Sequence, residues 1–256
     1  MILAQNIHKS FKDKVILNGI DFTFERGKTN LIIGKSGAGK TVLLKTLIGL
    51  ITPDKGNVFY DDIDFYTLNF KEKRALRKKV GMLFQGVALF DSMTIEENIR
   101  FPLDMFTDMT DMEKSMQVAS CLERVDLHDV NLKFPSELSG GMQKRVGIAR
   151  AIVMNPEYLF CDEPNSGLDP KTSIIIDELI KGITVERNIT TIINTHDMNS
   201  VMEIGENILL LEKGLIAWTG HKTDILSSNN KNINDFIFAS PFLKKLKEKA
   251  FPETKP

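Results

Sequence analysis

The sequence predicts an α/β domain with a largely parallel sheet, and three observations support this. Short apolar strands alternate with helical patterns over most of the chain, which is typical of units that build a parallel sheet. Between about residue 93 and residue 153 the strand patterns stop and helical spacing dominates, which predicts a helical insertion. The chain of 256 residues is long enough for one sizeable core that carries such an insertion.

The individual elements follow from hydrophobic spacing along the chain. Short apolar or alternating runs predict strands at Met1–Phe11, Gly19–Phe24, Asn30–Ile33, Asn57–Tyr60, Val80–Phe84, Tyr158–Asp162, Thr190–Asn194, Asn207–Leu211 and Leu215–Trp218. Helices are expected where apolar residues recur three and four positions apart, as Val42, Leu43, Leu47 and Leu50 do. They cover Lys40–Leu50, Phe70–Lys79, Thr94–Phe101, Asp111–Val125 and Gly140–Met154, and a helical tail starts at Lys222 and breaks at Pro241.

Composition argues against several classes of protein. The formal net charge of -1 lacks the basic excess typical of nucleic-acid binding, so no nucleic-acid partner is expected. Cys121 and Cys161 have no metal-type spacing, which fits free thiols in a reducing compartment. The chain shows neither a signal-like start nor an apolar run long enough to cross a bilayer. We therefore expect a cytosolic protein whose membrane role comes through a partner.

A glycine-rich loop follows the third predicted strand and opens the first predicted helix. It matches the pattern GxxxxGK[ST] with Gly34, Lys35, Ser36, Gly37, Ala38, Gly39, Lys40 and Thr41. Glycines allow successive N–H groups to point at phosphate oxygens, and the helix start adds the positive end of its dipole. Lys40 would place its charge on the outer phosphates, and Thr41 would offer a hydroxyl to Mg²⁺. The strand before and the helix after it favour nucleotide binding over a plain flexible turn.

Two adjacent acids end the predicted strand Tyr158–Asp162. In a chain with a phosphate loop, the two acids have separate tasks. Asp162 is expected to hold Mg²⁺, directly or through water, and Glu163 to orient the attacking water as general base. The alternative is a pair of solvated carboxylates at the edge of a sheet.

A second helix start also has the features of an anion site. Ser139 suits a helix N-cap, and Gly140 and Gly141 leave the backbone N–H groups unshielded. The chain therefore carries two devices that can bind phosphate. The alternative is a capped helix with a flexible entry.

The order GKSGAGKT, Gln85, LSGGMQKR, LFCDEP, SGLDP and THD resembles the ATP-binding cassette ATPase family over residues Ile2–Gly220. The resemblance implies a P-loop NTPase (RecA-like) core in residues 1–220, with an N-terminal antiparallel β subdomain, an inserted helical subdomain at 86–154 and a C-terminal helical tail at 221–256. It also implies a homodimer in which each ATP lies between the phosphate loop of one subunit and the LSGG element of the other, with Mg²⁺ as cofactor.

Several residue roles follow from the resemblance alone. Gln85 would sense Mg²⁺ and the attacking water, Asp169 would lie at the dimer interface, and His196 would contact the γ-phosphate. Thr46 is expected among the nucleotide-binding residues. Phe11 stands where the family usually has a tyrosine that stacks on adenine; the alternative is a core aromatic on an early strand.

Two features resemble one branch of the family. The signature reads LSGGM where many importers have LSGGQ, and residues 82–90 and 101–103 are unusually apolar for a surface region. Both resemble the ATPase subunit of Mla-type (MCE-associated) phospholipid transporters of bacterial envelopes. That implies an integral-membrane permease, an MCE lipid-binding protein and a STAS-domain subunit as partners, at the cytoplasmic face of the inner membrane. An importer of amino acids or metabolites, or a cell-division ATPase, is the alternative.

Two apolar surfaces have competing interpretations. Val87, Ala88, Leu89 and Phe90 would either line a groove for a permease helix or be buried under the helical insertion. In the tail, apolar residues would either grip the neighbouring ATPase subunit or pack on their own domain. They are Ile233, Phe236 and Ile237, followed after the break by Phe242, Leu243 and Leu246.

Overall fold

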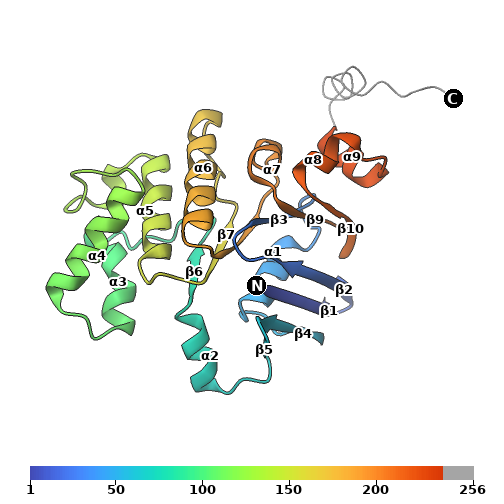
Figure 1. Ribbon diagram of the computed structural model, residues 1–256, viewed down its shortest axis with the longest axis horizontal. Coiled ribbons are helices and arrows are strands. Elements are labelled where there is room, and N and C mark those ends of the chain that lie inside the picture. The colour runs from blue at the N-terminus through green and yellow to red at the C-terminus, as the bar shows by residue number, and fades with distance from the viewer. Residues whose placement is uncertain (239–256) are drawn as a thin grey trace. The chain divides into compact units, whose positions relative to one another are not determined.

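The structure, a computed structural model, describes residues 1–238, which form two compact units. The first unit contains Met1–Glu25, Thr29–Tyr66 and the chain from Asn194 onward. The second unit contains Arg26–Lys28 and Thr67–Ile193. Figure 1 labels the helices and strands of both units.

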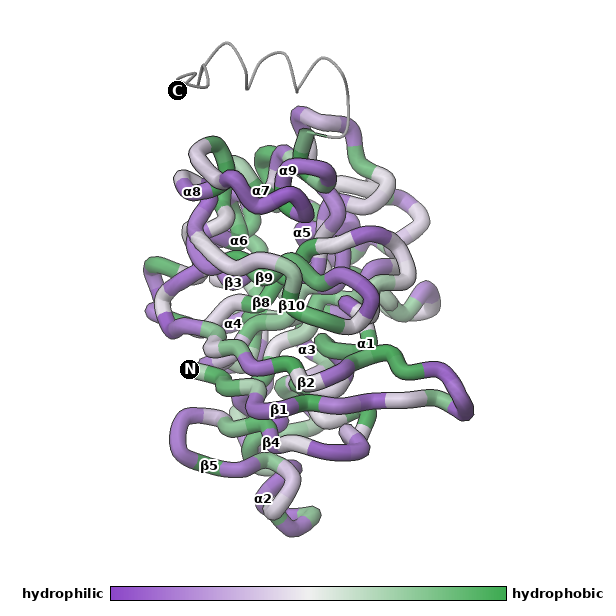
Figure 2. The backbone as a smooth tube through the Cα atoms, turned by 90° about the vertical axis from the view of Figure 1, so that its right-hand side faces the viewer, coloured by the Kyte–Doolittle hydropathy of each residue, from purple (hydrophilic) through white to green (hydrophobic). Residues whose placement is uncertain are grey.

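An antiparallel sheet forms one part of the first unit. It consists of β1 (Ile2–Phe11), β2 (Lys14–Phe24), β4 (Lys55–Tyr60) and β5 (Ile63–Asp64), in the order β2-β1-β4-β5. The hydrophilic turn between β1 and β2 lies at the tip of a long hairpin (Figure 2). The predicted antiparallel N-terminal portion is confirmed.

The remainder of the first unit surrounds a buried central strand. All five residues of β3 (Thr29–Ile33) are buried, and β3 pairs in parallel with β9 (Asn207–Glu212). β10 (Leu215–Gly220) continues antiparallel from β9. The helices of this unit are α1 (Lys40–Leu47), α7 (Met198–Ile204), α8 (Lys222–Ser227) and α9 (Lys231–Ile237).

The second unit has its own parallel strands. β6 (Val80–Leu83) pairs in parallel with β7 (Tyr158–Asp162), and β8 (Thr190–Asn194) is next in the order β8-β7-β6, its last residue belonging to the first unit. Every residue of β7 and β8 is buried, as expected for strands covered on both faces. α2 (Phe70–Arg77) precedes β6, and α6 (Pro170–Glu186) follows β7.

Helices occupy the predicted insertion in the second unit. They are α3 (Ile95–Phe106), α4 (Asp111–Arg124) and α5 (Gly140–Ile152), with a short 3₁₀ turn at Pro135–Glu137. Thr94 and Thr110 each accept a hydrogen bond from the backbone N–H three residues on, and a glutamate returns the bond, so the chain fixes both helix starts locally. No helix within residues 1–238 is long and apolar enough to cross a membrane.

The structure differs from the predicted elements at a few ends. β2 begins at Lys14 rather than Gly19, and β5 has two residues, too few to show any periodicity. α3 continues through Pro102 to Phe106, although proline usually ends a helix. In the tail, Ile233 and Ile237 are buried in the first unit, which favours packing on the same chain there. The predicted break at Pro241 and the residues Phe242, Leu243 and Leu246 lie outside the described residues.

Candidate functional site

The phosphate loop of the first unit is shaped by its glycines. A Cβ on Gly34 would lie 2.3 Å from the carbonyl oxygen of Leu211, and one on Gly39 would lie 2.9 Å from that of Ile16, so no larger residue fits. Gly37 has φ +80°, and nothing lies within 4 Å of the point where its Cβ would be, so its conformation rather than its surroundings requires glycine. The loop exposes Lys35, Ser36 and Gly37, while Gly34 and Ala38 are buried. This arrangement leaves backbone at the surface before the N-terminus of α1.

Lys40 and Thr41 at the start of α1 lie where the sequence predicts the phosphate and metal contacts. Lys40 is 7% exposed, and its Nζ donates to the carbonyl oxygens of Gly34 and Lys35 at 2.8 Å and 3.4 Å. The ammonium therefore lies over the loop that is expected to surround phosphate. Thr41 is exposed, and its hydroxyl accepts a hydrogen bond from Nδ2 of Asn194 at 3.2 Å.

The other residues predicted in the first unit have different positions. Phe11 is 46% exposed at the end of β1, with Lys9 Nζ 5.4 Å from its ring centre, so the core alternative is wrong. His196 is exposed just after β8. The expectation for Thr46 needs correction, because its side chain is fully buried and its hydroxyl donates to the carbonyl of Val42 at 2.8 Å. The hydroxyl of Thr46 therefore bonds within its own helix and is not exposed to a ligand.

The second unit brings three of the predicted hydrolysis residues together. Asp162 ends β7 and is 8% exposed, and Glu163 follows it. Nε2 of Gln85 donates to a carboxylate oxygen of Glu163 at 2.9 Å. Glu163 has φ +49°, a left-handed conformation that is uncommon for a residue with a side chain. Gln85 and Glu163 can thus act on the same water molecule.

Cations of α5 hold the loop that follows β6. Nζ of Lys144 donates to the carbonyl oxygen of Gln85 at 2.6 Å, and Arg150 donates to the carbonyls of Val87 and Ala88 at 2.5 Å and 2.7 Å. Val87 and Ala88 have φ +61° and +54°, so this loop needs such support. Burial lowers the pKa of Lys144, and the negative charges of the nearby Glu163 and Asp162 oppose that shift.

The Ser-Gly-Gly element begins α5 as predicted. Ser139 is the N-cap, and its hydroxyl accepts from the N–H of Met142 at 3.4 Å. Gly141 lies against α6, because a Cβ there would be 2.7 Å from Thr172. The carboxylate of Asp169 accepts hydrogen bonds from the Thr172 hydroxyl and two backbone N–H groups, which lower the pKa of Asp169. Asp169 is exposed and caps α6 beside the Ser-Gly-Gly element.

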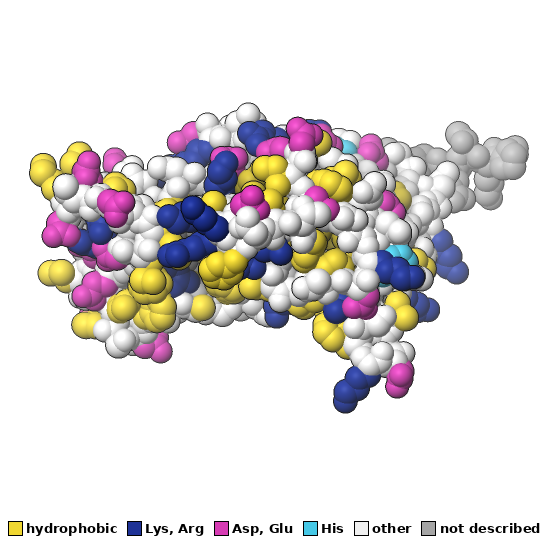
Figure 3. All heavy atoms as spheres, turned by 90° about the horizontal axis from the view of Figure 1, so that it is seen from below, with side chains coloured by type: hydrophobic (Ala, Val, Ile, Leu, Met, Phe, Trp, Pro, Cys, Tyr) yellow, Lys and Arg dark blue, Asp and Glu magenta, His cyan; other side chains and the backbone are white. Residues whose placement is uncertain are grey.

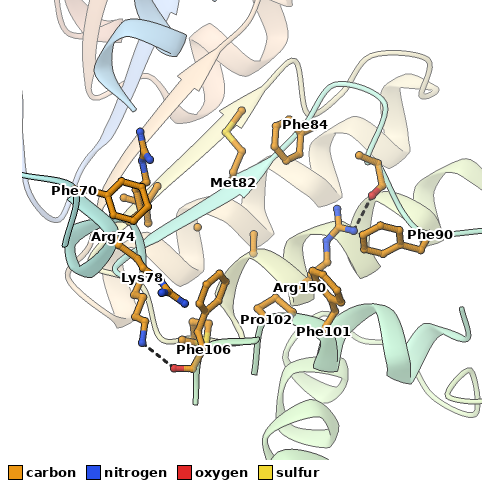
Figure 4. Close-up of a pocket in the computed structure, with 16 residues that line it drawn as sticks. Phe70, Arg74, Lys78, Met82, Phe84, Phe90, Phe101, Pro102, Phe106 and Arg150 are labelled. Atoms are coloured by element: carbon orange, nitrogen blue, oxygen red, sulfur yellow. Dashed lines mark hydrogen bonds between the residues drawn. The ribbon is translucent and has the colours of Figure 1, made fainter. Parts of the chain in front are cut away.

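A groove of about 650 Å³ opens on the second unit between α2, β6, α3 and α5. Figure 4 shows Phe84, Phe90, Phe101 and Phe106 around it, with Arg74, Lys78 and Arg150 among them. The rings of Phe90 and Phe101 are 5.0 Å apart, and Lys78 donates to the carbonyl of Phe106 at 3.0 Å. The space-filling view shows Lys and Arg side chains gathered beside exposed hydrophobic ones (Figure 3).

The predicted lining of this groove is correct in part. Ala88 and Phe90 line it, whereas Val87 is buried with 5% exposure and packs over Gly147, and Leu89 is not among the lining residues. The interpretation as burial therefore holds for Val87. Sequence reasoning missed Lys144, Arg150 and Asn194, because a single lysine, arginine or asparagine on an element carries no pattern that reveals its hydrogen-bond partner.

The chemistry of the candidate metal ligands fits magnesium. They are the hydroxyl of Thr41, the carboxylate of Asp162 and the amide oxygen of Gln85, all of them oxygen donors. Mg²⁺ prefers oxygen ligands, keeps several waters and needs few protein groups when it also binds phosphate. Thr41 belongs to the first unit and the other two residues to the second.

Curated relatives resemble this chain over nearly its full length. The methionine import ATP-binding protein MetN 1 of Oceanobacillus iheyensis is 38% identical over 242 residues, which cover 93% of this chain and 71% of the relative. The probable ribonucleotide transport ATP-binding protein mkl of Mycobacterium bovis is 36% identical over 236 residues, 92% of this chain and 66% of the relative.

A solved structure and a family model agree with these relatives. A bacterial ABC transporter cassette, solved as a dimer, superposes with a TM-score of 0.80 at 31% identity and covers 87% of this chain and 99% of that one. CbiO1 from Clostridium perfringens, part of an ABC transporter complex, gives 0.83 at 27% identity and covers 96% and 98%. Residues 17–166 match the family described as ABC transporter. The chain therefore belongs to the ABC transporter family, as an ATPase cassette with a P-loop NTPase fold that binds and hydrolyses ATP with Mg²⁺.

Proposed function

We propose that two copies of this chain close around two ATP molecules and so drive an integral-membrane permease from the cytoplasmic face of the membrane. In this proposal residues 1–220 form the cassette, 86–154 its inserted helical subdomain and 221–256 its tail. The groove on the second unit is the observation that carries the proposal. Its aromatic lining is large enough for the apolar face of a short helix, and such a face in a groove is a recurring mode of recognition.

The residues of the two units have complementary tasks. The N–H groups of the phosphate loop and the Lys40 ammonium would hold the phosphates, and Glu163 would orient water in line with the γ-phosphate. Gln85 would share that water, His196 would contact the γ-phosphate, and Phe11 would stack on adenine. Mg²⁺, when bound, neutralises charge on the outer phosphate oxygens. Ser139 to Gly141 would face the ATP of the other subunit, with Asp169 beside them at the interface.

The proposed cargo is a phospholipid that moves between bacterial envelope membranes. The LSGGM signature and the apolar segments that supply Met82, Phe84, Phe90, Phe101 and Pro102 to the groove support this, through their resemblance to Mla-type ATPases. An MCE lipid-binding protein and a STAS-domain subunit would then join the permease. Import of a small solute such as methionine is the second candidate, favoured by the 38% identity to MetN 1.

Co-purification with the native permease tests the groove. Phe90→Asp places a charge among the aromatic rings, and we expect it to reduce recovery of the permease about tenfold or more, as loss of a central apolar contact usually does. Nucleotide binding should be retained, since Phe90 lies in the second unit and the phosphate loop in the first. Val185→Asp, an equal change at an exposed valine on α6, is the matched control. Normal recovery of the permease with Phe90→Asp would show that the groove is not the docking site.

Lipid analysis of the same complex tests the cargo. The complex purified through this chain should carry phospholipid in excess over a detergent-matched preparation of an unrelated membrane protein. ATP should release or move that lipid in reconstituted vesicles, and the Lys40→Ala variant should not. Uptake of radiolabelled methionine that depends on ATP, without lipid movement, would establish the second candidate instead.

A further inference from the structure

A buried lysine of α5 lies where two functional loops meet. Lys144 is 4% exposed, and its Nζ lies 2.6 Å from the carbonyl oxygen of Gln85 and 3.5 Å from that of Glu163. Gln85 and Glu163 also bond to each other through their side chains at 2.9 Å. One ammonium therefore connects the main chains of both residues that are proposed to handle the attacking water.

The partners of Lys144 determine what it does. A buried ammonium is costly unless polar groups surround it, and here they are backbone carbonyls rather than a paired carboxylate. Bonds to carbonyls fix the path of the main chain and leave the side chains of Gln85 and Glu163 available for chemistry. Glu163 is the residue that needs such support, because its φ of +49° is held only if its surroundings impose it.

Close packing of α5 against β6 fixes the position of Lys144. A Cβ on Gly147 would lie 2.7 Å from Leu83 of β6, and one on Gly81 of β6 would lie 2.2 Å from the carbonyl oxygen of Ala151, so helix and strand touch closely at two levels. The Ser-Gly-Gly element at residues 139–141 starts the same helix, little more than one turn before Lys144. A displacement of the helix start would therefore reach both functional loops through Lys144.

We propose that Lys144 is a positioning residue for ATP hydrolysis: it holds Gln85 and Glu163 in register and links them to the Ser-Gly-Gly element on the same helix. This rests on the roles proposed above for Gln85 and Glu163. Lys144 contacts neither nucleotide nor water in this scheme. It acts through the backbone of the two residues that do, so its loss should change the rate of the chemical step rather than the affinity for ATP.

Steady-state hydrolysis by the purified full chain tests the proposal. Lys144→Met replaces the unbranched stem as far as Cε and removes the donor, Lys144→Gln keeps a donor, and Lys71→Met changes an exposed lysine on α2. We expect Lys144→Met to lower kcat at least tenfold while KM for ATP stays within about twofold, the signature of an interaction that matters after binding. Lys144→Gln should recover part of the rate, and Lys71→Met should match the wild type.

A thermal scan and a double-mutant cycle separate positioning from folding. The melting temperature of Lys144→Met should fall by only a few degrees, because the change leaves the Gln85 and Glu163 carbonyls without this donor but also removes a buried charge. With Gln85→Ala the loss should be less than additive, since both changes disturb one arrangement. A wild-type kcat in Lys144→Met, strict additivity, or a fall in kcat matched by a loss of folded protein in both Lys144 variants would overturn the inference. Wild-type turnover by Glu163→Gln in the same assay would instead refute the role of Glu163.

Discussion

At the scale of single residues, main-chain contacts place the functional side chains. Lys40 donates to two carbonyls of its own loop, and the Asp169 carboxylate accepts from backbone N–H groups at the start of α6. Contacts of this kind fix where a functional group lies through the backbone of its own loop or helix. The Gln85–Glu163 pair is the exception, since there two functional side chains bond directly. A single substitution in this pair can therefore remove the charge of Glu163 while keeping its hydrogen bond with Gln85.

Glu163→Gln removes the negative charge and keeps an oxygen that can accept the hydrogen bond from Gln85. We expect ATP binding to be retained and turnover to fall by about 10²-fold or more, the range typical of a lost general base. Rapid-quench measurement of phosphate release, with ATP affinity from a fluorescent nucleotide, separates the two effects. Gln85→Ala is the companion variant, which removes the donor and keeps the charge. Turnover of Glu163→Gln near the wild-type rate would rule out a role as base.

The two cysteines offer a prediction from pKa. Burial raises the pKa of Cys121 to about 11 and that of the Cys161 thiol further still, so both remain neutral thiols at pH 8. A thiol reagent should therefore not react with the folded chain at pH 8, and it should label two thiols once denaturant unfolds the protein. Rapid labelling of the native protein would show that one of the buried sites opens.

At the scale of elements, α5 and β6 form the framework on which the functional loops depend. Gly81 and Gly147 allow helix and strand to approach until side-chain and backbone atoms meet, and Lys144 and Arg150 bond to the loop that leaves the strand. The sequence predicts both elements well, because their apolar residues follow clear periods. It does not predict how closely the helix and the strand pack, because a glycine inside an element can be there for several different reasons.

Gly81→Ala measures how tightly this framework is packed. The added Cβ would lie 2.2 Å from a backbone carbonyl oxygen that cannot rotate away, so strand and helix must separate. We expect a loss of about 1–3 kcal/mol in the free energy of unfolding, measured by urea titration. Gly86→Ala is the matched control, because nothing lies within 4 Å of its added Cβ. Equal stability of the two variants would mean that the contact relaxes without cost.

Residues whose roles depend on local chain geometry are predictable from the sequence, whereas residues whose partners are distant in sequence are not. Ser139, Thr41 and the Asp162–Glu163 pair are predictable because each lies at the end of an element, where its task follows from local chain geometry. The resemblance predicts Thr46 as a ligand contact, yet its side chain is buried and its hydroxyl donates to the carbonyl of Val42 in the same helix. Asn194 and Lys144 bond to groups 153 and 59 residues away, and no local pattern encodes such partners.

At the level of the complete chain, the two proposed phosphate-binding devices belong to different units. The phosphate loop lies in the first unit and the Ser-Gly-Gly element in the second, beside Asp169. Both present backbone near a helix N-terminus, which is a favourable place for an anion. A second copy of the chain would give each ATP one device of each kind. Dimerisation should then depend on nucleotide and should fail when either device repels phosphate.

Gly140→Asp tests this dependence in the Glu163→Gln background, where ATP persists. Gly140 is exposed, and its nearest neighbour to an added Cβ is Leu168 at 3.8 Å, so aspartate fits without strain. Its carboxylate would repel the phosphates of the partner's ATP, so Mg-ATP should convert Glu163→Gln to dimers but leave the double variant monomeric in analytical ultracentrifugation. Nucleotide binding by the monomer should persist, because the phosphate loop is untouched, and Glu163→Gln with Val185→Asp should still dimerise. ATP-dependent dimers of the Gly140→Asp variant would mean that the Ser-Gly-Gly element does not face the second nucleotide.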